Sequence, residues 1–135
     1  MLKAQEINGD LSVVILCGGK GERLHPITND IPKCLLKINN KTLLENHLDN
    51  LLGLPIRCVT IVVGFKKGKI IDKIGKEYQG LPISYVESKE YNSTNHSWSL
   101  FLAKNDITKQ KNPLLITHAD TYYDPRLLTM LIESS

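Results

Sequence analysis

The chain has 135 residues, of which 41% are hydrophobic and 23% are charged. This size and composition fit one globular domain with its own core, so we expect residues 1–135 to form a single domain. The formal net charge of +3 is small, and the lysine-rich stretches are not accompanied by an aromatic platform or an arginine stripe, so we expect no nucleic-acid partner.

The sequence has no pattern typical of a membrane-spanning segment or of a disulfide-bonded, secreted protein. Residues 1–10 lack the basic start and apolar run of a secretory signal, and no stretch approaches the roughly 20 apolar residues of a membrane span. The chain has three cysteines, without a CxxC pair or a metal-ligand spacing. Because an odd number argues against a disulfide framework, we expect a reduced, cytoplasmic protein without a membrane partner.

The first half of the chain predicts two buried strands and two helices. Residues 11–17 form a short apolar run followed by two glycines, which is typical of a buried parallel strand. A helix is expected over residues 42–52, with Thr42 and Glu45 forming a capping box. Residues 58–64 are β-branched and apolar and predict a second strand, and isoleucines at helical spacing predict a helix within the basic segment 66–78.

The second half continues this alternation of strands and helices. We expect a third strand at residues 82–86, a third helix at 97–104 and a fourth strand at 114–117. Asp124 is expected to cap a last helix, with Pro125 at its first helical position.

Strands that alternate with helices at this spacing predict an α/β fold. We expect a three-layer α/β/α, Rossmann-like open sheet, mostly parallel, with helices on both faces. If the first three strands extend the sheet in one direction and the fourth returns beside the first, the strand order is 3-2-1-4. That order places a switch point between the first and fourth strands, where ligands bind at the carboxyl ends. We therefore expect the loops at residues 18–26 and 118–122 to share one site.

The loop after the first strand holds three glycines within four residues, Gly18, Gly19 and Gly21. Glycines let backbone N–H groups converge on an anion, while Arg23 adds a planar donor fork and Lys33 adds a point charge. A flexible turn is the alternative for the glycines alone, but it gives no reason for the basic residues. The loop is not a Walker A loop, because it lacks that motif's spacing of glycine, lysine and serine or threonine. It is not a dinucleotide fingerprint, because the third glycine of that motif is missing.

Residues 19–33 resemble the signature of the sugar-phosphate and choline-phosphate nucleotidyltransferases, Gly-x-Gly-x-Arg-(Leu/Met)-x-Pro-x-Thr followed by Pro-Lys. The matching residues are Gly19, Gly21, Arg23, Leu24, Pro26, Thr28, Pro32 and Lys33. In that family the loop wraps the triphosphate, and its arginine and lysine act on the phosphates. The resemblance implies a sheet of the nucleotide-diphospho-sugar transferase type and a catalytic role for Arg23 and Lys33. It also implies a nucleotide-binding role for five residues: Cys17, Gly18, Gly19, Lys20 and Gly21.

Three further residues are assigned by the same resemblance. Asp120 follows the fourth strand, where the family usually has an aspartate that holds Mg²⁺, so the resemblance implies Asp120 as metal ligand and Mg²⁺ as cofactor. A carboxylate suits the hard oxygen ligands of Mg²⁺, and a surface-turn aspartate is the alternative. Asn95 and Ser97 lie in a stretch that resembles the base-binding region of bacterial choline-phosphate cytidylyltransferases, although both are equally good turn or helix-cap residues.

The implied activity is transfer of a nucleoside monophosphate from a nucleoside triphosphate, with CTP favoured, and with release of pyrophosphate. The acceptor would be a phosphorylated small molecule such as phosphocholine, a phosphonate or a sugar 1-phosphate. A non-catalytic nucleotide-binding or assembly module of the same fold is the alternative. Because family members are usually much longer, we expect this chain to be the N-terminal, nucleotide-binding portion, apparently truncated. An unpaired fourth strand is a template for self-association, so a homo-oligomer is a further hypothesis.

Overall fold

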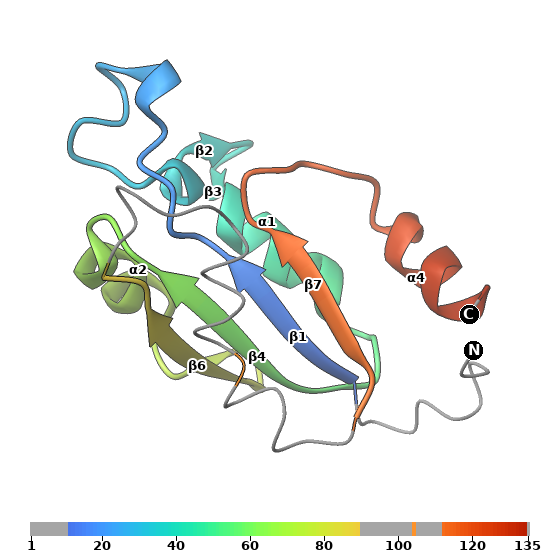
Figure 1. The fold of residues 1–135 in the computed structure, drawn as a ribbon. Coiled ribbons are helices and arrows are strands. Elements are labelled where there is room, and N and C mark those ends of the chain that lie inside the picture. The colour runs from blue at the N-terminus through green and yellow to red at the C-terminus, as the bar shows by residue number, and fades with distance from the viewer. Residues whose placement is uncertain (1–10, 90–103, 105–111, 135) are drawn as a thin grey trace.

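The structure, a computed structural model, describes residues 11–89, 104 and 112–134. Its central element is a five-stranded sheet in the order β5-β6-β4-β1-β7 (Figure 1). Four of its strands run parallel: β1 Leu11–Leu16, β4 Ile56–Val63, β6 Leu81–Glu87 and β7 Leu114–His118. In chain order these are the four predicted strands, so the predicted order 3-2-1-4 is confirmed.

Strand β1 lies between β4 and β7, and all six of its residues are buried. Val13 is paired with Val59 on one side and with Leu115 on the other. A parallel strand that is covered on both faces needs apolar residues in succession, which explains the run Leu-Ser-Val-Val-Ile-Leu. The carboxyl end of β1 therefore meets the carboxyl ends of two other parallel strands.

Three helices, α1 Leu43–Leu51, α2 Lys67–Ile74 and α4 Arg126–Glu133, share one core with one face of the sheet. That core includes Leu44, Leu48 and Leu51 of α1, Ile70 and Ile74 of α2, Leu128 of α4, and alternate strand residues such as Val13, Ile15, Val59 and Ile61. A smaller core on the opposite face holds Val14, Leu16 and Val62. The helix predicted at residues 97–104 lies outside the described residues except for Lys104, which is helical.

Helix α1 begins with the predicted capping box. The backbone N–H of Glu45 donates to the Thr42 hydroxyl (3.1 Å), and the N–H of Thr42 donates to the Glu45 carboxylate (2.8 Å). These bonds satisfy N–H groups that have no partner within the helix. Leu44 and Leu48 are completely buried, so α1 is fixed at its start and along its inner face.

A short hairpin before α1 was not predicted. Strands β2 Lys37–Ile38 and β3 Lys41–Thr42 pair antiparallel. Asn39 and Asn40 form the turn, and both have positive φ, 53° and 68°. Asparagine tolerates this left-handed region, so Asn39-Asn40 is a turn signal present in the sequence.

The helix expected within residues 66–78 is shorter than that segment. Helix α2 ends at Ile74, where Gly75 takes a φ of 76° and turns the chain out of the helix. The next residues form β5 Glu77–Tyr78, which pairs antiparallel with β6. The basic segment therefore contains a helix and an edge strand.

Helix α4 begins one residue later than predicted. It starts at Arg126 rather than at Pro125, but the Asp124 side chain accepts the Arg126 N–H (2.9 Å) as a cap would. Strand β7, which precedes it, is the last strand of the described sheet. Self-association through β7 stays a prediction.

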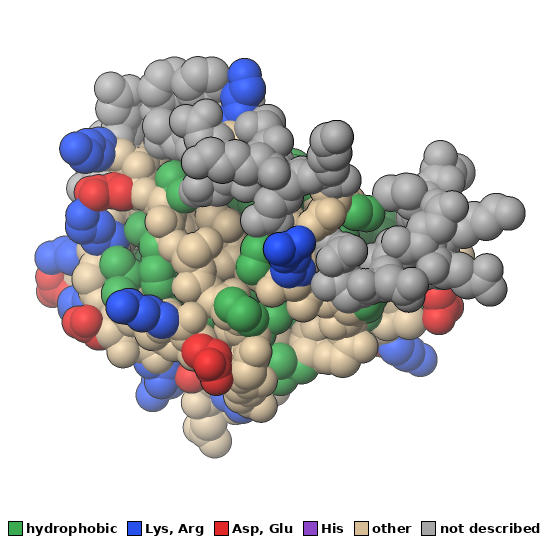
Figure 2. Space-filling view, turned by 90° about the horizontal axis from the view of Figure 1, so that it is seen from below, with side chains coloured by type: hydrophobic (Ala, Val, Ile, Leu, Met, Phe, Trp, Pro, Cys, Tyr) green, Lys and Arg blue, Asp and Glu red, His purple; other side chains and the backbone are tan. Residues whose placement is uncertain are grey.

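Charged side chains of opposite sign lie next to one another on the surface, as Figure 2 shows for one face. Ion pairs between elements include Lys67 with Glu87 and Lys73 with Glu45. Exposed pairs of this kind contribute little to stability because water screens them. None of the described helices is long and apolar enough to cross a membrane.

A buried histidine connects α1 to β7 and to the chain that follows it. His47 is 1% exposed, and its Nε2 lies 2.7 Å from the Thr117 hydroxyl. The Tyr123 ring meets the imidazole edge-on, with centroids 5.2 Å apart, and its hydroxyl lies 3.5 Å from the same nitrogen. Nδ1 of His47 is buried without a hydrogen-bond partner within the described ranges. Burial, together with the nearby His118, lowers the pKa of His47 to about 4.

The pKa of His47 predicts a loss of stability in mild acid. The folded state keeps His47 neutral down to about pH 4, whereas the unfolded chain takes up a proton near pH 6.5. The contribution of His47 is therefore complete above pH 6.5 and is lost as the pH falls from 6.5 towards 4, by about 3 kcal/mol at most. Urea unfolding at a series of pH values measures this loss. In His47→Gln, which does not titrate, the slope in this interval should shrink; an unchanged slope would assign the effect to other groups.

Candidate nucleotide-binding site

Two loops begin side by side at the carboxyl edge of the sheet: residues 17–36 after β1, called the signature loop below, and the residues after β7. The N–H of Ala119 donates to the C=O of Leu16 (3.3 Å), where the two strands end. The signature loop contains two short 3₁₀ helices, Glu22–Leu24 and Lys33–Leu35. In Figure 1 this loop extends beyond the carboxyl edge of the sheet, where the strand order predicts a site.

One ion pair joins the two loops. Nζ of Lys33 lies 3.0 Å from Oδ2 of Asp120. Lys33 opens the second 3₁₀ helix, and Asp120 follows the end of β7 closely. Both side chains are partly exposed, 36% and 45%, so a ligand can reach them. The structure thus brings the predicted catalytic lysine against the predicted metal ligand.

Asp120 is ionised at neutral pH. Burial acts to raise its pKa, but the hydrogen bond and the charge of Lys33 outweigh burial and hold the pKa below its ordinary value. Over residues 11–89, 104 and 112–134, no three His, Cys, Asp or Glu side chains form a cluster that could hold a metal ion. A single exposed carboxylate still fits Mg²⁺, which keeps several waters and shares phosphate oxygens with its nucleotide.

Gly21 brings the signature loop back upon itself. Its φ is 66°, in the left-handed region that glycine adopts readily. A Cβ at this position would lie 3.1 Å from both Lys33 Cβ and Thr28 Cγ2. Thr28 is completely buried, and its hydroxyl donates to the C=O of Gly21 (2.7 Å). The last glycine of the motif therefore allows the chain to pack against Thr28 and Lys33.

Gly18 and Gly19 lie in open surroundings. Among the described residues, a Cβ at either position would have no atom within 4 Å apart from its chain neighbours, so packing against these residues does not require glycine there. Open space beside the N–H groups of a loop is what an approaching phosphate needs. Nucleotide binding by Gly18, Gly19, Lys20 and Gly21 stays a prediction.

The structure gives fewer contacts for the other predicted site residues. Arg23 lies in the first 3₁₀ helix with an exposed side chain, and it forms no ion pair in the part of the chain that the structure describes. Asn95 and Ser97 fall outside the described residues. The structure therefore brings Lys33 and Asp120 together, places Arg23 in the same loop, and leaves the predicted base contacts untested.

Cys17 is the first residue of the signature loop. Its side chain is buried, and its N–H donates to the C=O of Val62 (2.8 Å). Burial, with further contributions from Cys34 and Asp120, raises the pKa of the Cys17 thiol well above its ordinary value. The thiol is therefore protonated and is not a nucleophile at neutral pH. The predicted contact between Cys17 and the nucleotide is not tested.

A contact that sequence reasoning missed ties the signature loop to α2. Nζ of Lys69 donates to the C=O of Asp30 (2.6 Å), and Nζ of Lys66 lies 3.9 Å from the Asp30 carboxylate. The lysines before and within α2 thus hold the loop from the side opposite β7. Asp30 and Lys69 are 39 positions apart, and no local pattern links them.

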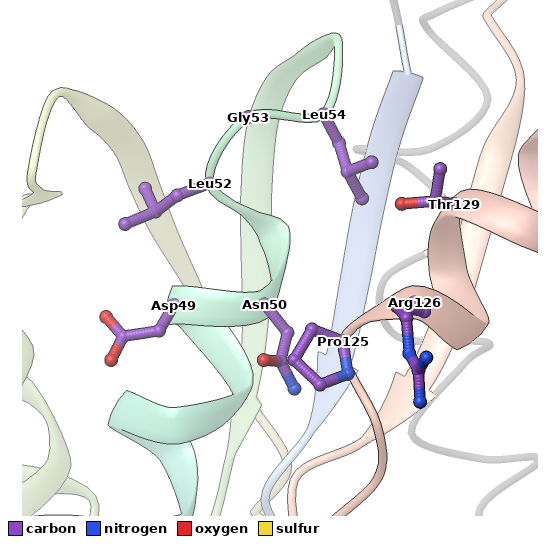
Figure 3. Close-up of a pocket in the computed structure, with 8 residues that line it drawn as sticks. All are labelled: Asp49, Asn50, Leu52, Gly53, Leu54, Pro125, Arg126 and Thr129. Atoms are coloured by element: carbon purple, nitrogen blue, oxygen red, sulfur yellow. The ribbon is translucent and has the colours of Figure 1, made fainter.

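A separate hollow lies between the end of α1 and the start of α4 (Figure 3). Its volume is about 240 Å³, and it is lined by Asp49, Asn50, Leu52, Gly53, Leu54, Pro125, Arg126 and Thr129. Its charged groups are already paired, Asp49 with Lys41 and Arg126 with Asp124. None of the predicted site residues lines this hollow, so it is not the candidate site.

The different surroundings of Gly21 and Gly19 predict different effects of alanine. In Gly21→Ala the new side chain meets positive φ and two close neighbours, so we expect the free energy of unfolding to fall by about 1–3 kcal/mol. Gly19→Ala meets no such neighbours and should change it by less than about 0.5 kcal/mol. Urea unfolding of the two variants measures the difference. Equal stabilities would contradict the packing role of Gly21.

Comparison with known proteins identifies relatives along almost the whole chain. The family model described as nucleotidyl transferase matches residues 12–134. The UTP–glucose-1-phosphate uridylyltransferase AglF of Haloferax volcanii is 37% identical over 87 residues, which cover 64% of this chain and 36% of that protein. The D-glycero-α-D-manno-heptose 1-phosphate guanylyltransferase of Campylobacter jejuni is 31% identical over 125 residues, 93% of this chain and 54% of that protein.

A solved structure agrees with the fold. The CTP:phosphocholine cytidylyltransferase LicC of Streptococcus pneumoniae superposes with a TM-score of 0.70 and 29% identity, over 84% of this chain and 46% of that chain. The predicted Rossmann-like fold of the nucleotide-diphospho-sugar transferase type is therefore confirmed. The chain spans about half or less of the length of each of these three proteins. On the family model and these relatives, the chain belongs to the nucleotidyl transferase family.

Proposed function

We propose that this chain is the nucleotide-binding part of a Mg²⁺-dependent nucleotidyltransferase that uses CTP by preference and releases pyrophosphate. The observation that carries the proposal is the ion pair between Lys33 and Asp120, 3.0 Å apart, which joins the signature loop to the end of β7. A metal-bound triphosphate needs cationic partners for its oxygens and an anionic ligand for its metal. Both kinds of partner lie at one carboxyl edge of the sheet.

The proposed phosphate contacts lie in the signature loop. Its amides at residues 18–21 receive phosphate oxygens, which the open space beside Gly18 and Gly19 supports. Arg23 has an exposed guanidinium whose fork suits the phosphate that is transferred. Lys33 supplies a second positive charge next to Asp120. We assign the catalytic roles to Arg23 and Lys33.

Asp120 is the proposed ligand of Mg²⁺. Its carboxylate is ionised at neutral pH and partly exposed, as a ligand of this cation must be. When bound, Mg²⁺ supplies positive charge to the phosphates and to the leaving pyrophosphate. We assign to Lys33, which pairs with Asp120 at 3.0 Å, a contact with phosphate oxygens of the same nucleotide.

The proposed transfer needs no general base. An acceptor phosphate is ionised near neutral pH, so one of its oxygens attacks the α-phosphorus directly. The bond from the α-phosphorus to the bridging oxygen breaks in line, and that oxygen leaves with pyrophosphate. The contribution of the protein is alignment and charge neutralisation by the loop amides, Arg23 and Lys33.

The choice of substrates draws on the relatives. Their names describe uridylyl, guanylyl and cytidylyl transfer with glucose 1-phosphate, a heptose 1-phosphate and phosphocholine. We propose phosphocholine, a phosphonate or a sugar 1-phosphate as acceptor, and CTP as donor because of the stretch around Asn95 and Ser97. The three cysteines with free thiols fit a reducing, cytoplasmic setting, which we also propose.

Two measurements on the 135-residue chain test the proposed function. Calorimetry measures binding of CTP, UTP, GTP, ATP and dTTP with and without Mg²⁺. A pyrophosphate assay measures turnover with phosphocholine, aminoethylphosphonate and glucose 1-phosphate. We expect Mg²⁺-dependent binding that is strongest for CTP, and pyrophosphate release with at least one acceptor. Binding without turnover favours the non-catalytic module, and absence of binding for every nucleotide refutes the site.

Replacing Arg23 tests the catalytic assignment. Arg23→Ala should slow pyrophosphate release roughly 10²- to 10³-fold, as expected when one electrostatic stabiliser of the transferred phosphate is lost. Arg57 is the matched control, because it is an exposed arginine near the amino end of β4, at the opposite edge of the sheet. Arg57→Ala should turn over like the unaltered chain. Unchanged turnover in Arg23→Ala would remove Arg23 from the mechanism.

A further inference from the structure

The loop that carries Asp120 is held on both sides by one side chain of α1. His47 Nε2 lies 2.7 Å from the hydroxyl of Thr117, three residues before Asp120. The same nitrogen lies 3.5 Å from the hydroxyl of Tyr123, three residues after it. The Tyr123 ring also meets the imidazole edge-on at 87°. One histidine therefore contacts both flanks of a short loop.

His47 is itself held rigidly. It lies in α1, where Leu44 and Leu48 are completely buried and the capping box at Thr42 fixes the start of the helix. The imidazole is 1% exposed and makes its described hydrogen bonds through Nε2. Burial keeps the ring neutral at neutral pH, so these contacts are present under ordinary conditions.

Asp120 needs support from the residues that flank its loop, because its own contacts are weak. Its side chain is 45% exposed, and it pairs with a lysine that is 36% exposed. A pair as exposed as this one does little to fix a backbone. The preceding residue, Ala119, is completely buried, but its N–H reaches the C=O of Leu16 over 3.3 Å, a long hydrogen bond. The position of Asp120 therefore depends on what holds the flanks of its loop.

We propose that His47 is a positioning residue, which acts through Thr117 and Tyr123 to hold Asp120 opposite Lys33. The inference rests on the role proposed above for Asp120. A site of this kind needs its charged groups held by residues whose own conformations are locked by packing. His47 meets that requirement from a buried position in α1.

Amide hydrogen exchange tests the inference without any need for activity. Thr117→Val keeps the shape of the side chain and removes the hydroxyl that contacts His47. We expect the Ala119 N–H to exchange about 10-fold faster in this variant, because the loop opens more often. The Ser12 N–H, bonded to the C=O of Pro113 (2.9 Å) at the other end of the same strand pair, should change by less than about twofold.

A second threonine provides the matched control. Thr60 is buried in β4, and its hydroxyl contacts Ser84 of β6 (3.0 Å), away from α1 and from the Asp120 loop. Thr60→Val should leave Ala119 exchange unchanged. Equal effects of Thr60→Val and Thr117→Val, or equal acceleration at Ser12 and Ala119, would overturn the inference by showing a general loss of stability.

Substitution of His47 itself completes the test. His47→Leu should accelerate Ala119 exchange as Thr117→Val does. In His47→Gln the exchange should be slower than in His47→Leu, because the glutamine amide can replace the hydrogen bond to the Thr117 hydroxyl. If His47→Leu does not fold, Thr117→Val and His47→Gln still decide the matter. Ala119 exchange that matches the unaltered chain in Thr117→Val overturns the inference.

Kinetics provide a second readout that separates positioning from folding. In Thr117→Val we expect kcat for pyrophosphate release to fall about 10-fold and KM for the nucleotide to rise less than kcat falls, because the phosphate contacts of the signature loop are intact while Asp120 is displaced. A rise in KM alone would contradict the inference. If exchange changes as expected and no variant releases pyrophosphate, the positioning role stands and the proposed function fails.

Discussion

The ion pair between Lys33 and Asp120 is the interaction on which the candidate site depends. Its partners are 87 positions apart in the chain, and they meet because β1 and β7 are neighbours in the sheet. Strand β1 is hydrogen-bonded to a parallel strand at each edge, and its two faces are buried in two separate side-chain clusters. The candidate site therefore lies where the central strand and its neighbour β7 end.

Much of this arrangement follows from local sequence patterns. The apolar runs predict the four parallel strands, and the order 3-2-1-4 follows if the first three strands extend the sheet in one direction and the fourth returns beside the first. Thr42 and Glu45 predict the capping box, which the structure contains. The switch point predicts that the loops at residues 18–26 and 118–122 share one site, whereas the ion pair between Lys33 and Asp120 is not predicted by these patterns.

The remaining features depend on contacts between distant segments, which no local pattern encodes. Lys69 and Asp30, or His47 and Thr117, meet only because the helices fold onto the sheet and its loops. Thr28 was recognised as part of a motif, but its support of the Gly21 carbonyl requires the three-dimensional bend of the loop. The Asn39-Asn40 turn is different, because two successive asparagines are a local turn signal.

Nδ1 of His47 has no hydrogen-bond partner among the described residues, which has a consequence for engineering. A buried polar atom without a partner lowers the stability of the folded state, and an aliphatic side chain of similar size avoids that loss. The same substitution also removes the contacts of His47 Nε2 with Thr117 and Tyr123, so the stability of the core and the position of the Asp120 loop place opposite demands on residue 47.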